Sequence, residues 1–204
     1  MDQNAASADL DYIRRVLDRT ERRVDPHAFH FVHWGAIVLV WYPVMNYLGA
    51  NGSREYMLPV SLAAFLLGMV LSAVREMRLG KRPRLPGENT FVANQVMYVT
   101  WGVLGAAILL SALGPSTGMI DGRNVQIIWG FAYAVMAYMV GVVYRREFMW
   151  AGVAIFAGTV VALALPDVAG YLLGPFMGLG MIVPGMMAER RVRDLREETE
   201  AVAA

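Results

Sequence analysis

Six apolar blocks, each long enough to cross a lipid bilayer, determine what this chain can fold into. They cover residues 29–49, 56–74, 91–113, 125–144, 148–165 and 168–188. Because a helix rises about 1.5 Å per residue, roughly 20 apolar residues cross a hydrocarbon core about 30 Å thick. Short connectors, rich in turn-forming or basic residues, separate the blocks. The sequence therefore predicts an all-α, polytopic membrane protein with six transmembrane helices.

The predicted membrane domain covers residues 25–188, between a leader at 1–24 and a charged tail at 189–204. Within the leader, residues 8–24 are predicted to form a short amphipathic helix. The apolar stripe of this helix consists of Leu10, Ile13, Leu17 and Val24. The leader is polar and lacks the basic start and cleavage site of a signal peptide, so we do not expect its removal. The helix either lies near the lipid headgroups or docks a cytoplasmic partner.

The basic residues are distributed unevenly between the two predicted sides of the membrane. Of the 18 Lys and Arg residues, 16 fall in the leader, the second-to-third connector, the fourth-to-fifth turn and the tail. Only Arg54 and Arg123 lie on the opposite side. The positive-inside rule then places both termini in the cytoplasm. Lys81 is the only lysine, which is typical of a GC-rich bacterial genome, so we expect a bacterial inner membrane protein.

Several functional classes lack the residues that they need. The chain has no cysteine, which excludes disulfides, Cys-ligated zinc, iron–sulfur clusters and thiol catalysis. Asp, Glu, Lys and Arg are absent from the predicted spans away from their ends, which argues against proton-coupled transport. No Ser-His-Asp arrangement, P-loop, HExxH motif or carboxylate pair can be assembled, so we expect no enzymatic activity. A net charge of +1 gives no reason to expect a nucleic-acid partner.

All three histidines of the chain lie at the start of the first span. His27, His30 and His33 are spaced i, i+3, i+6, which spreads them over about 120° of a helix. Imidazole binds zinc, copper, iron or nickel, and a single His also serves as an axial ligand to haem or a chlorophyll-type pigment. We treat the three as candidate cofactor ligands that need partners from another span or chain. The alternatives are ordinary interfacial residues or a pH sensor.

Three amide side chains are candidates for lining a polar cavity. Asn94 and Gln95 are adjacent at the start of the third span, and Gln126 lies at the start of the fourth. Their alternative role is hydrogen bonding between helices, worth ~0.6–2 kcal/mol each.

Small residues form one face of the sixth span. Gly170, Gly174 and Gly178 make a tandem GxxxG motif, which lets another helix approach closely. That helix belongs either to a neighbouring span or to a second chain. Pro175 and Pro184 are predicted to kink the same helix or to open it locally.

Tryptophan recurs in the first half of several spans. Trp34, Trp101 and Trp129 are each followed by Gly, whereas Trp150 is not. Tryptophan at such positions commonly marks the membrane interface. The repeated Trp-Gly pair also suggests an internal duplication, although its spacing is not a fixed period.

These features favour an accessory or assembly subunit that packs in the bilayer against larger membrane proteins or a second copy of itself. In one variant the histidines ligate a metal, haem or pigment, whose identity the sequence does not specify. The alternatives are a small-solute transporter or substrate-binding membrane subunit, and a sensor that signals through the N-terminal helix. Six spans with both ends inside are similar in outline to the substrate-binding subunits of energy-coupling-factor vitamin transporters, in topology alone.

Overall fold

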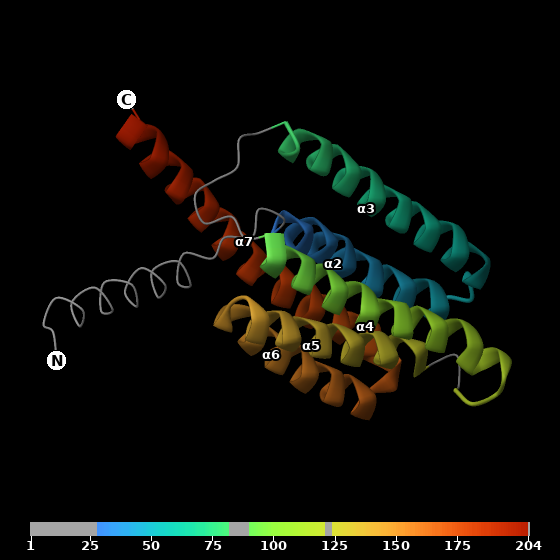
Figure 1. The fold of residues 1–204 in the computed structure, drawn as a ribbon. Helices are drawn as coiled ribbons and strands as arrows, with labels where there is room; N and C mark the ends of the chain where they lie inside the picture. Colours follow the sequence, from blue (N-terminus) through green and yellow to red (C-terminus); the bar gives the residue numbers. More distant parts are fainter. Residues whose placement is uncertain (1–27, 82–89, 121–123, 204) are drawn as a thin grey trace, which may run out of the picture.

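The computed structural model describes residues 28–81, 90–120 and 124–203, and the predicted N-terminal helix and His27 lie outside these ranges. Within them the chain is helical and contains no β-strand. The long helices are α2 (Phe29–Ala50), α3 (Met57–Leu79), α4 (Thr90–Ser116), α5 (Val125–Val143), α6 (Arg146–Ala164) and α7 (Ala169–Ala203) (Figure 1). Short 3₁₀ helices, η1 (Arg54–Tyr56) and η3 (Pro166–Val168), lead into α3 and α7. Six of the described helices are long and apolar enough to cross a membrane, in agreement with the six predicted helices of spanning length.

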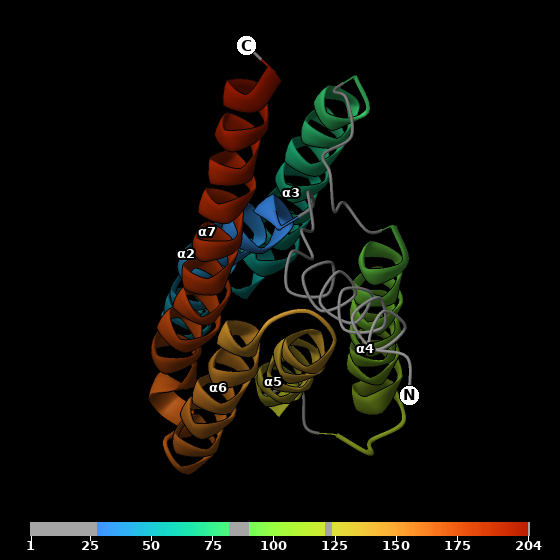
Figure 2. The same ribbon diagram turned by 60° about the vertical axis from the view of Figure 1, so that its left-hand side comes forward.

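Four helices form the centre of the molecule. α2 packs along α7, α7 packs along α6, and α6 packs along α5 (Figures 1 and 2). The largest fully buried side chains come from α5, α6 and α7, and they are Phe148, Met136, Ile155, Leu173, Met177, Val140 and Thr159. Thr159 satisfies its hydroxyl within its own helix by donating to the carbonyl oxygen of Ile155 at 2.8 Å. The core is therefore apolar and closely packed.

The GxxxG face of α7 packs against α2 of the same chain. A β-carbon at Gly178 would lie 2.6 Å from the Leu39 β-carbon and 2.9 Å from the Gly35 carbonyl oxygen. One turn earlier, a β-carbon at Gly174 would lie 2.8 Å from Pro43, and the next turn brings Gly170 against α2 in the same way. These distances are shorter than van der Waals contact, so only glycine permits the observed approach of the two backbones.

The fourth and fifth spans form a tight helical hairpin, as their three-residue connector predicts. Gly141 near the end of α5 lies against the backbone of Met149 on α6. Further along the hairpin, a β-carbon at Gly152 would lie 2.6 Å from the Tyr138 backbone nitrogen. At the turn itself, Arg145 donates to the Glu147 carboxylate at 2.6 Å.

Three helices extend beyond their predicted ends. α3 continues to Leu79, α4 includes residues 114–116 of the predicted loop, and α7 continues through residues 189–203 of the predicted tail. Hydropathy indicates where a helix leaves the bilayer, but Arg, Glu, Met and Leu sustain a helix in water as well. α7 is also one continuous helix through Pro175 and Pro184, so neither proline interrupts it.

α3 and α4 flank the central helices. Among the described elements, α3 makes extended contacts only with α2 and η1, and α4 makes them only with α5. Side-chain hydrogen bonds support the α2–α3 contact, and two of them involve tryptophans of α2. Trp41 Nε1 donates to Ser61 Oγ at 3.2 Å, and Trp34 Nε1 donates to Ser72 Oγ at 3.2 Å. Because the described contacts of α3 and α4 are with different helices, α3 and α4 make no extended contact with each other.

Candidate functional site

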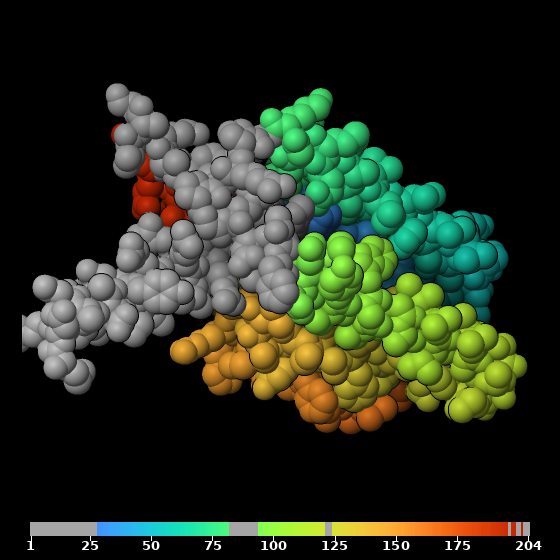
Figure 3. All heavy atoms as spheres, in the orientation of Figure 1, coloured from blue at the N-terminus to red at the C-terminus, as the bar shows by residue number. Residues whose placement is uncertain are grey.

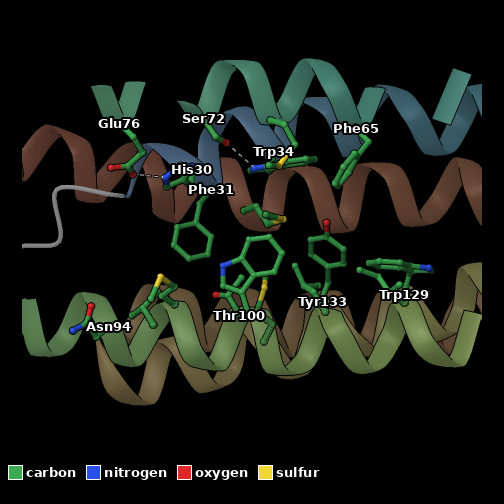
Figure 4. A pocket seen from close by; sticks show the side chains of 18 residues that line it. His30, Phe31, Trp34, Phe65, Ser72, Glu76, Asn94, Thr100, Trp129 and Tyr133 are labelled. Carbon is green, nitrogen blue, oxygen red and sulfur yellow. Dashed lines mark hydrogen bonds and ion pairs between the residues drawn. The ribbon is translucent and has the colours of Figure 1, made fainter. Parts of the chain in front are cut away.

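A hollow of about 570 Å³ lies between α3 and α4, with α2, α5 and α7 at its base (Figures 3 and 4). This volume lies within the usual range of small-molecule pockets, roughly 300–1,000 Å³. α4 lines the hollow from Asn94 to Ile108, which corresponds to about 21 Å along the helix axis at 1.5 Å per residue. The hollow is therefore elongated and runs along the helices rather than across them.

Aromatic and methionine side chains make up most of its wall. The aromatic lining residues are Phe31, Trp34, Phe65, Trp101, Trp129 and Tyr133. Four methionines, Met69, Met97, Met136 and Met181, also line it. Aromatic faces favour flat apolar or conjugated groups, and methionine adapts to irregular shapes. This lining is typical of a site for an apolar molecule.

The hollow opens between α3 and α4. Five of its lining residues remain between 41% and 58% exposed, and they are Phe65, Met69, Met97, Trp101 and Ile108. The first two belong to α3 and the other three to α4. The space-filling view shows α2 at the bottom of the cleft between these two helices (Figure 3). In a bilayer, this opening would face the lipid.

Polar side chains gather at one end of the hollow, where α2 begins and α3 ends. His30 Nε2 lies 2.8 Å from Glu76 Oε1, which links the first turn of α2 to the last turns of α3 (Figure 4). Asn94 and Thr100 line the same half of the hollow from α4. We call the end of the hollow at Glu76 and Asn94 the polar end.

A chain of hydrogen bonds joins α3 to α2 beside the hollow. The Trp34 indole donates to Ser72 Oγ at 3.2 Å, and Ser72 lies 2.9 Å from His33 Nε2. His33 Nδ1 lies 3.0 Å from the Phe29 carbonyl oxygen, which can only accept. His33 therefore donates from Nδ1, and in a neutral ring Nε2 would accept from the Ser72 hydroxyl. Both ring nitrogens of His33 are engaged within the protein.

The structure brings only some of the predicted site residues together. His30 and Asn94 line the hollow, and His33 is hydrogen-bonded beside it. His27 lies outside the described residues. Gln95 and Gln126 do not line the hollow, so the predicted polar cavity shares only Asn94 with it. Among the residues that the structure describes, no group of three or more His, Cys, Asp or Glu is placed to hold a metal ion.

Three of the four tryptophans predicted at the membrane interface also line the hollow. They are Trp34, Trp101 and Trp129. Trp150, which no glycine follows, is 66% exposed on α6 and lies outside the hollow. The repeated Trp-Gly pair was thus the signal in the sequence that marked the site. Ser72, Glu76 and Tyr133 had no comparable signal.

No protein-family model, curated protein or solved structure matches this chain. No relative therefore assigns a ligand to the hollow, and its chemistry rests on the side chains described above.

Proposed function

We propose that this protein is a membrane-embedded binding protein for a lipid-soluble small molecule that enters from the bilayer between α3 and α4. The observation that carries this proposal is the elongated, aromatic-lined hollow with polar groups at one end. A molecule with an apolar body and a small polar head matches that distribution, because its head would lie near His30, Glu76 and Asn94. This role corresponds to a substrate-binding membrane subunit rather than to an ion pathway.

The proposed orientation follows from the basic residues. The polar end of the hollow lies at the end of α3 and the start of α4, beside the strongly basic second-to-third connector. Under the positive-inside rule this end and both termini face the cytoplasm of a bacterial cell. A bound molecule would then place its head at the cytoplasmic side and its body in the hydrocarbon core.

The proposal is tested by titrating the detergent-purified protein with 9,10-dibromostearic acid and with decylubiquinone, both of which quench tryptophan fluorescence. Three of the five tryptophans line the hollow, so a ligand bound there produces saturable quenching. Leu104→Trp adds bulk inside the hollow and should weaken binding of any probe that occupies it by about tenfold or more.

Leu109→Trp provides the matched control. Leu109 is exposed on the same helix and does not line the hollow, so this variant should bind the probes like the wild type. Each variant adds one tryptophan, which keeps the fluorescence backgrounds comparable. If neither probe gives saturable quenching, or if the two variants weaken binding equally, the proposal is overturned.

The exposure of α3 favours a second candidate role, that of an accessory subunit. Only 6% of its most apolar 18-residue stretch is buried within the protein, and among the long helices that the structure describes it makes extended contact only with α2. A larger membrane protein could pack on this face. Photo-crosslinking from Leu66 on α3 in native membranes tests this role, with Val142 on α5 as an equally exposed control. A single protein adduct from Leu66 alone supports the role, whereas lipid adducts from both positions argue against it.

A further inference from the structure

One hydroxyl group inside the hollow lies away from the polar end. Tyr133, on α5, is only 7% exposed, and its hydroxyl points into the hollow beyond Trp34 and Thr100 (Figure 4). Within the part of the chain that the structure describes, no hydrogen bond reaches this hydroxyl. Burying a phenol without a partner is unfavourable, and buried tyrosines usually find one. The Tyr133 oxygen faces the hollow and is not enclosed by protein, so a bound molecule can supply its missing partner.

A second hydroxyl in the hollow, on a half-buried side chain, also has no partner among the described residues. Thr100 lines the hollow from α4, and no described residue forms a hydrogen bond with its side chain. It lies between Tyr133 and the polar end (Figure 4). Both hydroxyls can donate, so a bound molecule with acceptor atoms at two depths would satisfy both of them. A fatty acid has its oxygen atoms only at one end, and its chain would leave Tyr133 without a partner.

Aromatic rings face each other across the hollow around the Tyr133 hydroxyl (Figure 4). On the α2 and α3 side, the rings of Trp34 and Phe65 lie 6.0 Å apart between centroids. On the α5 side, the rings of Trp129 and Tyr133 lie 6.2 Å apart (Figure 4). Aromatic side chains stack in offset or tilted arrangements on planar conjugated groups. A flat ring placed between these pairs would contact aromatic side chains on both sides.

We propose that the ligand is a planar, lipid-soluble ring with oxygen acceptors on both edges and an apolar tail, the chemistry of the isoprenoid quinones. This inference rests on the proposed function, because it names the class of molecule that occupies the same hollow. One ring oxygen accepts from Tyr133, and the opposite one accepts from Thr100 or from the polar end. The tail leaves through the opening between α3 and α4, beside exposed Met97 and Ile108.

The test compares the two probes in hydroxyl-deletion variants. Tyr133→Phe should weaken decylubiquinone binding about five- to tenfold, which is the usual effect of losing one buried hydrogen bond. The same variant should leave 9,10-dibromostearic acid binding unchanged, since that molecule has no acceptor near Tyr133. Tyr138→Phe removes a hydroxyl from an exposed position of the same helix and should change neither affinity. Thr100→Val, which keeps the side-chain shape, provides a second test from α4.

The outcomes separate this inference from the proposed function. A loss confined to decylubiquinone in Tyr133→Phe or Thr100→Val supports a ring with two acceptor edges. If dibromostearic acid binds saturably, and decylubiquinone either does not bind or is insensitive to both variants, the quinone inference is overturned while the hollow remains a lipid site. If neither probe binds saturably to the wild type, both proposals are overturned.

Discussion

The indole ring of Trp34 lies against Gly68 of α3 so closely that a β-carbon at Gly68 would overlap the ring. The same indole donates to Ser72, one turn further along α3, at 3.2 Å. Trp34 thus attaches α3 to α2 and at the same time forms part of the wall of the hollow. The position of this one ring connects the stability of the α2–α3 pair with the shape of the site.

Gly68→Ala should displace the Trp34 ring, because the added methyl group takes its place. We expect a cost of about 1–3 kcal/mol, typical of an added methyl group in a packed contact. Thermal unfolding in detergent, followed by circular dichroism, measures this loss. Gly102→Ala is the control, since nothing lies within 4 Å of a β-carbon there. Equal unfolding temperatures for the two variants would contradict the described contact.

Gly178→Ala should destabilise the fold through the seam between α2 and α7. Its β-carbon would meet the Gly35 carbonyl oxygen at 2.9 Å, and backbone atoms cannot move aside as a side-chain end can. We expect a loss of about 1–3 kcal/mol from the forced separation of the helices. Gly105→Ala, in open space on α4, controls for the change in helix propensity. A fold that tolerates Gly178→Ala as well as Gly105→Ala would show that the seam is looser than described.

Tyr42→Phe should leave stability unchanged or raise it. The Tyr42 hydroxyl is fully buried and has no hydrogen-bond partner among the described residues. Removing a buried polar group that lacks a partner is nearly neutral or stabilising, by up to about 1 kcal/mol. The thermal midpoint in detergent is the measurement, and Tyr47→Phe at an exposed position of the same helix is the control. A clear loss of stability confined to Tyr42→Phe would indicate a partner for this hydroxyl.

Arg75→Ala should cost more stability than Glu189→Ala. Arg75 donates to Glu189 at 2.8 Å, but both side chains are about 40% exposed, and such ion pairs contribute roughly 0–1 kcal/mol. Arg75 also lies 5.1 Å above the Phe29 ring centroid, a contact that Glu189→Ala leaves intact. A double-mutant cycle over the two positions separates the ion pair from the ring contact. Equal losses in the two single variants would assign the whole effect to the ion pair.

The proposed orientation predicts the labelling of two engineered cysteines in an otherwise cysteine-free chain. Asn51→Cys, in the exposed turn after α2, should react with a membrane-impermeant maleimide on intact cells. Lys81→Cys, beyond the other end of α3, should react only after the membrane is opened. The reverse pattern would invert the topology derived from the basic residues.

The six helices could be predicted from hydropathy because only spanning segments combine such length with so few charges. Their ends were less predictable, since α3 and α7 continue into segments whose polar residues still favour a helix. The site was predictable only in part. Successive helical residues are about 100° apart, so Asn94 faces the hollow while its neighbour Gln95 does not. The meeting of His30 with Glu76 depends on which helices adjoin, and a single sequence carries no signal for that.

Among the long helices that the structure describes, α3 makes extended contact only with α2, and α4 only with α5. In the proposed binding role, this arrangement sets how the hollow discriminates between molecules. One wall belongs to the α2–α3 pair and the other to the α4–α5 pair, and the described residues of α3 make no extended contact with α4. The width of a bound molecule is therefore weakly constrained. The positions of its polar groups along the helices are constrained much more strongly, because each polar side chain has a fixed place along the axis of its helix. Selectivity in such a site comes from where a molecule carries its oxygen atoms and how long it is, rather than from how thick it is.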